Sequence, residues 1–276
     1  MAFPANHQQC DARIRRAFMQ LKGSVALITG ASEGIGAACA MELARAGARL
    51  SLAARSEAGL AAAAAGTGAL ITPGDITSEE TRRSVVERTL ARYGSIDILI
   101  NNAGAGLYLP SWNAPLEEVR RLMELNFFAL LGLTQLVVPH MRARRHGMIV
   151  NVGSIAGKVS LPWLTLYSAS KFAVGAFTEG LRMELKRDGV RTMVVCPGYV
   201  RTAFQQHARG GSPPNAMVRA RRFTITAEQC AAAIRRGIER DARTVVTPRS
   251  GWLFIVAMRL FPSFVESRMA ALNQTA

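Results

Sequence analysis

Residues 24–36 read Ser24-Val25-Ala26-Leu27-Ile28-Thr29-Gly30-Ala31-Ser32-Glu33-Gly34-Ile35-Gly36. The first six are mostly apolar, include β-branched side chains and end at a glycine, which predicts a buried strand of a parallel sheet. The alanine-rich stretch that follows, 37–46, predicts a helix. A strand, a glycine turn and a helix in this order can bind a dinucleotide pyrophosphate, because the glycines let the backbone approach closely and the helix N-terminus offers amides.

The rest of the chain continues the alternation of strand and helix. This alternation predicts an α/β fold with a Rossmann-like, doubly wound parallel sheet of about seven strands. No linker divides the chain, so we expect one domain at 22–248, an N-terminal extension at 1–21 and an apolar C-terminal extension at 249–276. The strands are expected near 24–29, 49–54, 68–72, 96–101, 147–153, 190–196 and 243–247.

Local signals refine this outline. Thr77-x-x-Glu80 and Thr226-x-x-Gln229 predict capping boxes at the starts of two helices. The segment from about 199 to 225 is long and irregular, with Gly210-Gly211 and Pro213-Pro214 within it. A loop of that length inside a compact domain is usually either a functional lid or disordered.

Three side chains in the second half of the chain form a candidate proton-transfer group. Tyr167 and Lys171 stand four residues apart in Tyr167-Ser168-Ala169-Ser170-Lys171, which places them on one face of a helix within about 6 Å. An adjacent ammonium favours a phenolate, so we expect Lys171 to lower the pKa of Tyr167 from about 10 toward the range of a working base. Ser154 would hydrogen-bond the oxygen that exchanges the proton. A pair on a solvated helix face is the alternative, and the upstream glycine turn argues against it.

With these motifs in order, the chain resembles the short-chain dehydrogenase/reductase family from about Lys22 to Pro248. The marks of the family are the Thr-Gly-x-x-x-Gly-x-Gly turn at 29–36, Asp75 after the third strand, Asn101-Asn102-Ala103-Gly104 after the fourth, Asn126 in the next helix, Ser154, Tyr167 with Lys171, and Pro197-Gly198 with Thr202.

The resemblance implies a role for each of these residues. Asp75 would contact the adenine, with a solvated strand-end residue as the alternative. Asn101 would tie neighbouring strands together, and Asn126 would be a fourth catalytic residue whose side chain or backbone holds a water between Lys171 and solvent. The segment 199–225 would cover the substrate. The cofactor site would comprise Gly30, Gly34, Ile35, Gly36, Asp75, Asn102, Gly104, Tyr167, Lys171, Pro197, Gly198 and Thr202.

The implied reaction is hydride transfer between a nicotinamide cofactor and a carbonyl or alcohol, with Tyr167 as the acid or base. A rival interpretation is a non-catalytic NAD(P)-sensing scaffold. Such a protein would be expected to have lost some of its catalytic residues, whereas Asn126, Ser154, Tyr167 and Lys171 are all present.

The residues after the second strand favour NADP(H) over NAD(H) as the cofactor. An NAD enzyme places a carboxylate there for the ribose 2′-hydroxyl, but this chain has Ala54, Arg55 and Ser56. A guanidinium at Arg55 suits a 2′-phosphate, and Ser32 could add a hydroxyl. Glu33 opposes this assignment, because a carboxylate would repel the phosphate, and NAD(H) therefore stays open.

The formal net charge of +15 invites a nucleic-acid-binding interpretation. The arginines are scattered, however, with small clusters at 13–16, 142–145 and 219–222 and no basic strip interleaved with aromatic residues. We therefore expect no specific nucleic-acid partner. Salt-dependent nucleic-acid binding without dehydrogenase activity would support the rejected alternative.

Cysteine usage and the N-terminus bear on the compartment. Cys10, Cys39, Cys196 and Cys230 lack the spacing of a metal or disulfide site, so no metal is expected and a reduced, cytoplasmic protein is the default. Residues 1–20 contain no apolar core of a signal peptide. Ile14, Phe18 and Leu21 could form one side of a short amphipathic helix.

The substrate is expected to be a small, apolar carbonyl or alcohol compound that resembles a lipid, a steroid or an aromatic molecule. Its pocket would be lined by Val159, Leu161, Pro162, Trp163, Leu164, Tyr108, Tyr199 and Phe204. The alternative for Trp163 and Leu164 is a core or subunit contact. Family habit suggests a homodimer or a homotetramer.

The C-terminal extension contains an apolar segment at 251–265 that Arg259 and Pro262 interrupt. It is too short for a transmembrane helix. It could lie in a membrane interface as a peripheral contact, or pack over the substrate pocket or against another subunit, and we favour the second option.

Overall fold

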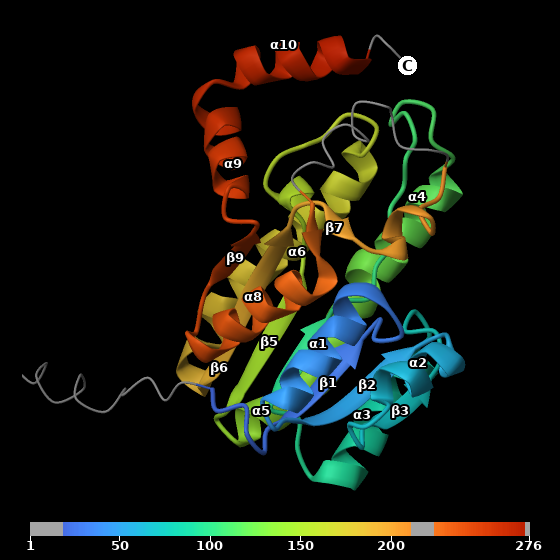
Figure 1. Ribbon diagram of the computed structural model, residues 1–276, viewed down its shortest axis with the longest axis vertical. Coiled ribbons are helices and arrows are strands. Elements are labelled where there is room, and N and C mark those ends of the chain that lie inside the picture. The colour runs from blue at the N-terminus through green and yellow to red at the C-terminus, as the bar shows by residue number, and fades with distance from the viewer. Residues whose placement is uncertain (1–18, 211–223, 274–276) are drawn as a thin grey trace, which may run out of the picture.

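The computed structural model describes residues 19–210 and 224–273 and contains a seven-stranded parallel sheet with helices on both faces (Figure 1). All neighbouring strands of this sheet run parallel, in the order β3-β2-β1-β4-β5-β6-β9. The predicted α/β class and the seven predicted strands are confirmed. The strands are β1 (Val25–Thr29), β2 (Arg49–Ala54), β3 (Leu70–Pro73), β4 (Ile98–Asn101), β5 (Gly147–Val152), β6 (Val190–Pro197) and β9 (Thr244–Thr247).

Helices fill the intervals between strands and form two apolar layers. The longer ones are α1 (Gly34–Arg45), α2 (Glu57–Ala64), α3 (Glu79–Tyr93), α4 (Leu116–Met123), α5 (Ala129–Ala143), α6 (Thr165–Glu184), α8 (Ala227–Glu239), α9 (Gly251–Leu260) and α10 (Pro262–Asn273). Short 3-10 turns are η2 (Ile155–Gly157), η3 (Lys186–Asp188) and η4 (Ala203–Gln205), and a second small sheet pairs β7 (Val200–Arg201) with β8 (Ile225–Thr226).

Each face of the large sheet has its own core. On one face, α1 and α8 pack together, and Leu43 and Ile234 from them join the first apolar cluster. On the other face, Val85 of α3, Leu133 of α5 and Leu181 of α6 join the second. Burial on both faces explains why the strands read as continuous apolar runs instead of alternating ones.

The strand order places a crevice between the carboxyl ends of β1 and β4. From β1 the chain winds outward through β2 to β3 and then crosses back to β4 on the other side of β1. The ligand crevice of an open α/β sheet lies at such a switch point, because successive connections leave the strand ends in opposite directions.

One of the two predicted capping boxes is confirmed and the other is wrong. Thr226 and Gln229 cap α8 reciprocally. At α3 the cap is Ser78, because Thr77 is already engaged: its amide and hydroxyl both donate to Asp75 Oδ1 at 2.9 Å. An aspartate that bonds the backbone two residues on forms a tight turn, and this turn shifts the start of the helix by one residue.

A continuous helical stretch from Leu116 to Ala143 is long and apolar enough to cross a membrane by length and composition. It comprises α4, a π-helical turn η1 (Glu124–Phe128) and α5. Leu133, Val137 and Met141 are completely buried in the second core cluster. We therefore assign this stretch to the protein core.

Near the N-terminus, Leu21 is buried together with Met19 in the first core cluster. The rest of the proposed amphipathic segment, Ile14 and Phe18, lies outside the described residues. The same holds for the arginine clusters at 13–16 and 219–222.

Candidate active site

A cavity of about 1420 Å³ opens at the carboxyl ends of the central strands. It brings together nearly all of the predicted site residues from seven separate stretches of the chain. Its walls include Gly30, Ser32, Gly34, Ile35, Arg55, Asp75, Asn102, Gly104, Ser154, Tyr167, Lys171, Pro197, Gly198 and Thr202. Two predicted residues, Gly36 and Asn126, stand behind the wall.

The glycine turn has the shape of a phosphate cradle. Gly30 and Gly34 have φ angles of +62° and +57°, which side chains rarely tolerate. A Cβ at Gly36 would lie 2.2 Å from the Gly30 carbonyl oxygen, so Gly36 serves the close packing of α1 on the turn. Glu33, a described residue at the N-cap of α1, gives the helix no side-chain bond. The first amides of α1 therefore remain available to an anion such as a pyrophosphate.

Asn102 fastens this turn to β4. Its Nδ2 donates to the carbonyl oxygens of Thr29 at 3.0 Å and Gly30 at 3.1 Å. Asn101 points into the sheet instead, where its Nδ2 donates to Asn151 Oδ1 at 2.9 Å and to Thr134 Oγ1 at 3.1 Å. The expected role of Asn101 as a tie between strands agrees with this geometry.

At the end of β2 the cavity wall carries a cation and a helix N-terminus. Arg55 is exposed there, and among the described residues it has no ion-pair partner. Ser56 caps α2, its Oγ accepting from the Gly59 amide at 3.1 Å. Gly59 lies so close to Ser32 that a Cβ would stand 2.8 Å from the serine Cβ. The missing side chain thus lets the glycine turn and α2 form one wall.

Tyr167 and Ser154 meet in the middle of the cavity. Tyr167 projects from α6 and is 8% exposed. Burial raises the pKa of its phenol to about 12, even though a hydrogen bond with the Ser154 side chain acts to lower it. Ser154 is held in turn by the start of η2, where its Oγ accepts from the Ala156 amide at 3.1 Å.

Lys171 lies beside Tyr167 as the spacing predicted, but its effect on the phenol is not the expected one. Its Nζ stands 5.8 Å from the Tyr167 ring centroid and donates to the Val152 carbonyl oxygen at 2.9 Å. Burial lowers the pKa of Lys171 to about 8. The prediction that Lys171 lowers the pKa of Tyr167 is wrong for this structure, because loss of water disfavours the charged form of both groups.

Asn126 fixes the floor beneath this pair. It lies in the π turn η1 and is 1% exposed. Its Oδ1 accepts from the Ala105 amide at 2.8 Å, and its Nδ2 donates to the Ala105 carbonyl and to Ser170 Oγ, both at 3.0 Å. A Cβ at Gly104 would lie 3.0 Å from Asn126 Oδ1 and 3.4 Å from Lys171 Nζ, so these three residues form one packed group.

The far end of the cavity is apolar. Of the expected pocket residues, six line it: Tyr108, Leu161, Pro162, Leu164, Tyr199 and Phe204. Val159 and Trp163 are absent from the residues that form its wall. Val159 packs instead in a core cluster with Val246 and Ile255, and Trp163 faces Trp112 at 6.4 Å between ring centroids. The expectation that Val159 lines the pocket is therefore wrong, because Val159 packs in the core. Of the two residues with a core or subunit contact as the alternative, Leu164 packs in a core cluster and also lines the cavity, whereas Trp163 contacts Trp112 instead of the pocket.

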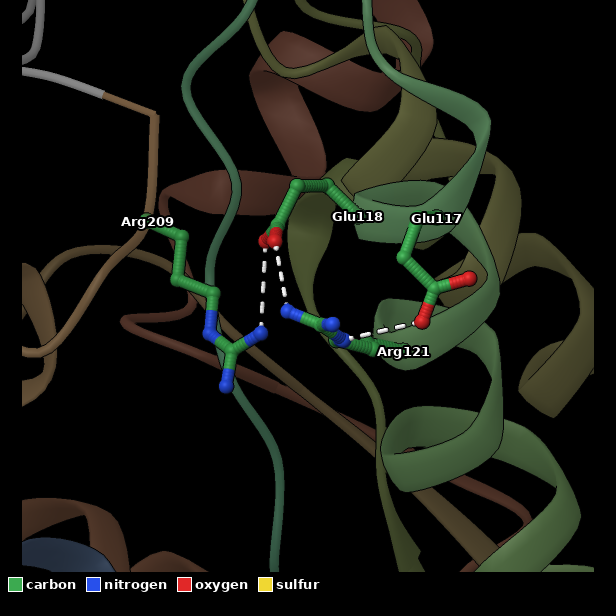
Figure 2. Close-up of polar contacts among 4 residues, drawn as sticks. All are labelled: Glu117, Glu118, Arg121 and Arg209. Carbon is green, nitrogen blue, oxygen red and sulfur yellow. Dashed lines mark hydrogen bonds and ion pairs between the residues drawn. The ribbon is translucent and has the colours of Figure 1, made fainter.

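Two polar side-chain contacts connect the described part of the expected lid, 199–210, to different parts of the cavity wall. His207 Nδ1 lies 3.0 Å from Glu33 Oε1 at the glycine turn. Figure 2 shows the second contact, in which the carboxylate of Glu118 in α4 forms ion pairs with Arg209 at 3.2 Å and with Arg121 at 3.0 Å. This segment thereby reaches from the glycine turn to α4 across the cavity wall.

Sequence reasoning missed several wall residues. Glu118, His207 and Arg209 carried no motif, and only the fold brings them together. Leu253 and Phe254 also line the cavity, which agrees with the favoured expectation that the apolar segment 251–265 packs over the pocket or against another subunit. Met269, which lines the cavity as well, lies outside that segment and was missed.

The family model described as short chain dehydrogenase matches residues 24–212. A dehydrogenase/reductase SDR family protein 7-like from Anopheles gambiae is 32% identical over 92% of this chain and 86% of its own length. An 11-beta-hydroxysteroid dehydrogenase-like 2 from Arabidopsis thaliana is 32% identical over 87% of this chain and 78% of its own.

Solved structures agree with the fold. A short-chain dehydrogenase/reductase from Burkholderia phymatum in complex with NAD has a TM-score of 0.81 and 26% identity, covering 91% of this chain and 96% of its own. A short chain dehydrogenase from Burkholderia cenocepacia in complex with NADP has a TM-score of 0.76 and 29% identity, covering 91% and 99%.

Proposed function

The chain belongs to the short-chain dehydrogenase/reductase family and is an NAD(P)-dependent oxidoreductase, and we propose that it uses NADP(H) to interconvert a carbonyl and an alcohol on an apolar substrate. The observation that carries this proposal is the continuity of the large cavity at the carboxyl ends of the strands. This cavity joins the glycine cradle at one end to an apolar pocket at the other, with Ser154 and Tyr167 between them.

The chain's own residues handle the proton. Bound nicotinamide would supply or accept the hydride, which side chains cannot do. With a phenol pKa of about 12, Tyr167 carries its proton at neutral pH and is set to donate it to a carbonyl oxygen. Ser154 orients the same oxygen through its hydroxyl. In the reverse direction the phenol has to lose its proton first, so a raised pKa favours reduction.

Lys171 and Asn126 lie next to Tyr167 and Ser154 and assist the proton transfer. Lys171 is placed to bind the cofactor ribose and to pass a proton toward Tyr167. Both ends of the Asn126 amide are engaged with Ala105 and Ser170. We therefore propose that the backbone of the π turn binds the water that would link Lys171 to solvent. The Asn126 side chain instead holds Ala105 and Ser170 in position. A π turn inside a helix frequently marks a functional site.

The preference for NADP(H) rests on the end of β2. Arg55, which has no ion-pair partner within the described part of the chain, lies at the wall beside the N-terminus of α2. A 2′-phosphate there would meet both a guanidinium and helix amides. The carboxylate of Glu33, which would oppose a phosphate, has the lid residue His207 as a partner. Asp75, on the same wall, is assigned to the adenine.

Arg55→Ala tests this preference. Because Arg55 is exposed and its pairing is screened by solvent, we expect the Michaelis constant for NADPH to rise about tenfold, within the range of charge-assisted bonds. The constant for NADH should stay nearly unchanged and serves as the internal control. A wild type that prefers NADH, or a variant that affects both cofactors alike, would overturn the assignment of Arg55.

The apolar substrate class is tested by a screen of NADPH consumption. Carbonyl compounds of graded size and polarity are compared by kcat/KM. Each additional buried methylene should contribute about 0.8 kcal/mol to binding, so kcat/KM should rise along an apolar series until the pocket is filled. A preference for sugars or other polar carbonyls would contradict the proposal.

A further inference from the structure

The helix α9 is apolar around almost its whole circumference, yet residues 19–210 and 224–273, the ones that the structure describes, cover only one side of it. Phe254, Ile255 and Met258 face the body, where they join the core cluster of Val246 and Val159. The other side carries Trp252, Leu253, Val256 and Leu260, which are 43%, 74%, 48% and 66% exposed. At about 100° per residue these four positions fall within one arc of the helix.

The exposed apolar surface continues past the end of α9. Phe261 and Phe264 are 63% and 64% exposed at the start of α10. Figure 1 shows α9 and α10 projecting from one end of the molecule, with α10 turned across α9. Contiguous exposed apolar patches of this kind mark an interaction site for a partner or a membrane.

The charges around this surface are cationic. Between 249 and 270 the sequence contains Arg249, Arg259 and Arg268 against the single carboxylate of Glu266. Arg268 lies over the Phe264 ring, with its guanidinium carbon 5.4 Å from the ring centroid. Long arginine side chains can keep their charged ends at a polar boundary while their stems cover apolar surface. An apolar face bordered by arginines fits an anionic lipid surface.

The same helices border the cavity. Leu253 of α9 and Met269 of α10 belong to its wall, next to Phe254. A membrane that covers the outer face would therefore lie beside the apolar end of the cavity. An apolar substrate dissolved in the bilayer would have a short path to Tyr167 that avoids water.

We propose that the exposed face formed by Trp252, Leu253, Val256, Leu260, Phe261 and Phe264 docks in the plane of an anionic lipid bilayer. The charge pattern favours this occupant over a second copy of the chain, because two copies of one cationic face would repel each other. The docking needs neither cofactor nor substrate and can be tested apart from the proposed reaction.

The experiment is co-sedimentation of the full chain with vesicles of phosphatidylcholine alone or mixed with phosphatidylglycerol. The wild type should pellet with the anionic vesicles. Leu260→Glu/Phe264→Glu should lose most of this binding, since both side chains are exposed and the fold does not depend on them. The matched control is Arg88→Gln/Ala91→Glu, which changes the net charge equally on exposed positions of α3 and should pellet like the wild type.

A second variant separates the charge from the apolar contact. Arg259→Ala/Arg268→Ala should weaken binding to anionic vesicles by about 25-fold at low salt, roughly fivefold per arginine, and leave binding to neutral vesicles unchanged. A wild type that stays in the supernatant with every vesicle would overturn the proposal. So would equal pelleting of wild type and Leu260→Glu/Phe264→Glu. A lower mass of this variant by light scattering would assign the face to a second copy of the chain instead.

Discussion

Burial acts on Tyr167 and Lys171 in opposite directions. It raises the pKa of the phenol to about 12 and lowers that of the ammonium to about 8. The spacing Tyr-x-x-x-Lys established that the two side chains share a helix face, but it contained no information on how much water surrounds them. The depth of the cavity, which depends on residues far apart in the sequence, determines which protonation state each group prefers.

The pH profile of catalysis follows from these two values. For carbonyl reduction, Tyr167 must hold its proton, which it does throughout the accessible range, and Lys171 must be cationic, which requires a pH below about 8. We therefore expect kcat/KM for reduction to be level at low pH and to fall as the pH rises through about 8. The rate of alcohol oxidation, which needs the phenolate, should rise with pH.

The measurement is kcat/KM in both directions between about pH 6 and pH 10, where bell-shaped or one-sided profiles report groups of the free enzyme. A reduction rate that increases through pH 8 would contradict the assigned protonation states.

Gly36 offers a second test at the residue scale. A Cβ there would collide with the Gly30 carbonyl at 2.2 Å and with Asn102 Nδ2 at 2.7 Å. Gly36→Ala should therefore cost roughly 1–3 kcal/mol of unfolding free energy, as overpacking does, and weaken cofactor binding by displacing the cradle. Chemical denaturation and titration with NADPH measure the two effects.

Gly180→Ala is the matched control, because it also lies within a helix and a Cβ there meets nothing within 4 Å. It should be neutral or slightly stabilising. Equal stability of the two variants would show that the turn tolerates a side chain.

At the scale of elements, the strands and the glycine turn could be predicted because each is a local pattern. The π turn η1 could not, since Glu124–Phe128 lies inside a continuous helical pattern from Leu116 to Ala143. No residue pattern within 116–143 marks the five residues that form the π-helical turn instead of an α-helical one. Asn126 was found through the family motif, whereas its bonds to Ala105 and Ser170 come from the fold.

The contact between Glu118 and Arg209 could not be predicted from the sequence either, because the two residues are 91 positions apart. Their ion pair is accessible to solvent, with side chains 27% and 51% exposed, so it should be worth no more than about 1 kcal/mol. We predict that Glu118→Gln raises the Michaelis constant of the carbonyl substrate up to about fivefold, by loosening the lid, and leaves NADPH binding unchanged.

Glu117→Gln is its control, because Arg121 is the one ion-pair partner of Glu117 among the residues that the structure describes and Glu117 lies outside the cavity wall. Steady-state kinetics of both variants provide the comparison. An equal rise of the Michaelis constant in both variants, or no rise in Glu118→Gln, would contradict a role of the Glu118–Arg209 ion pair in substrate binding.

At the scale of the whole molecule, the sheet order explains why predicted site residues from seven stretches of the chain meet in one cavity. Parallel strands deliver their carboxyl ends to one edge, so Gly30, Asn102, Ser154 and Pro197 arrive together although up to 167 residues separate them. The order of motifs in the sequence was sufficient to predict this convergence. The closing wall was predicted in outline, from the family resemblance for 199–225 and from the apolarity of 251–265. The individual contacts of Glu118, His207 and Arg209 were not predictable, because they depend on surface packing without a repeating pattern.

The central claim is that Tyr167 transfers the substrate proton inside this cavity, and Tyr167→Phe tests it most directly. Tyr93→Phe is the matched control, since it removes a hydroxyl that bonds the Leu50 carbonyl outside the cavity. With any carbonyl that the wild type reduces, Tyr167→Phe should lower kcat by about 10²–10⁴-fold, the usual contribution of a general acid. Titration should show NADPH binding nearly intact in both variants. Equal turnover of Tyr167→Phe and the wild type would contradict the account.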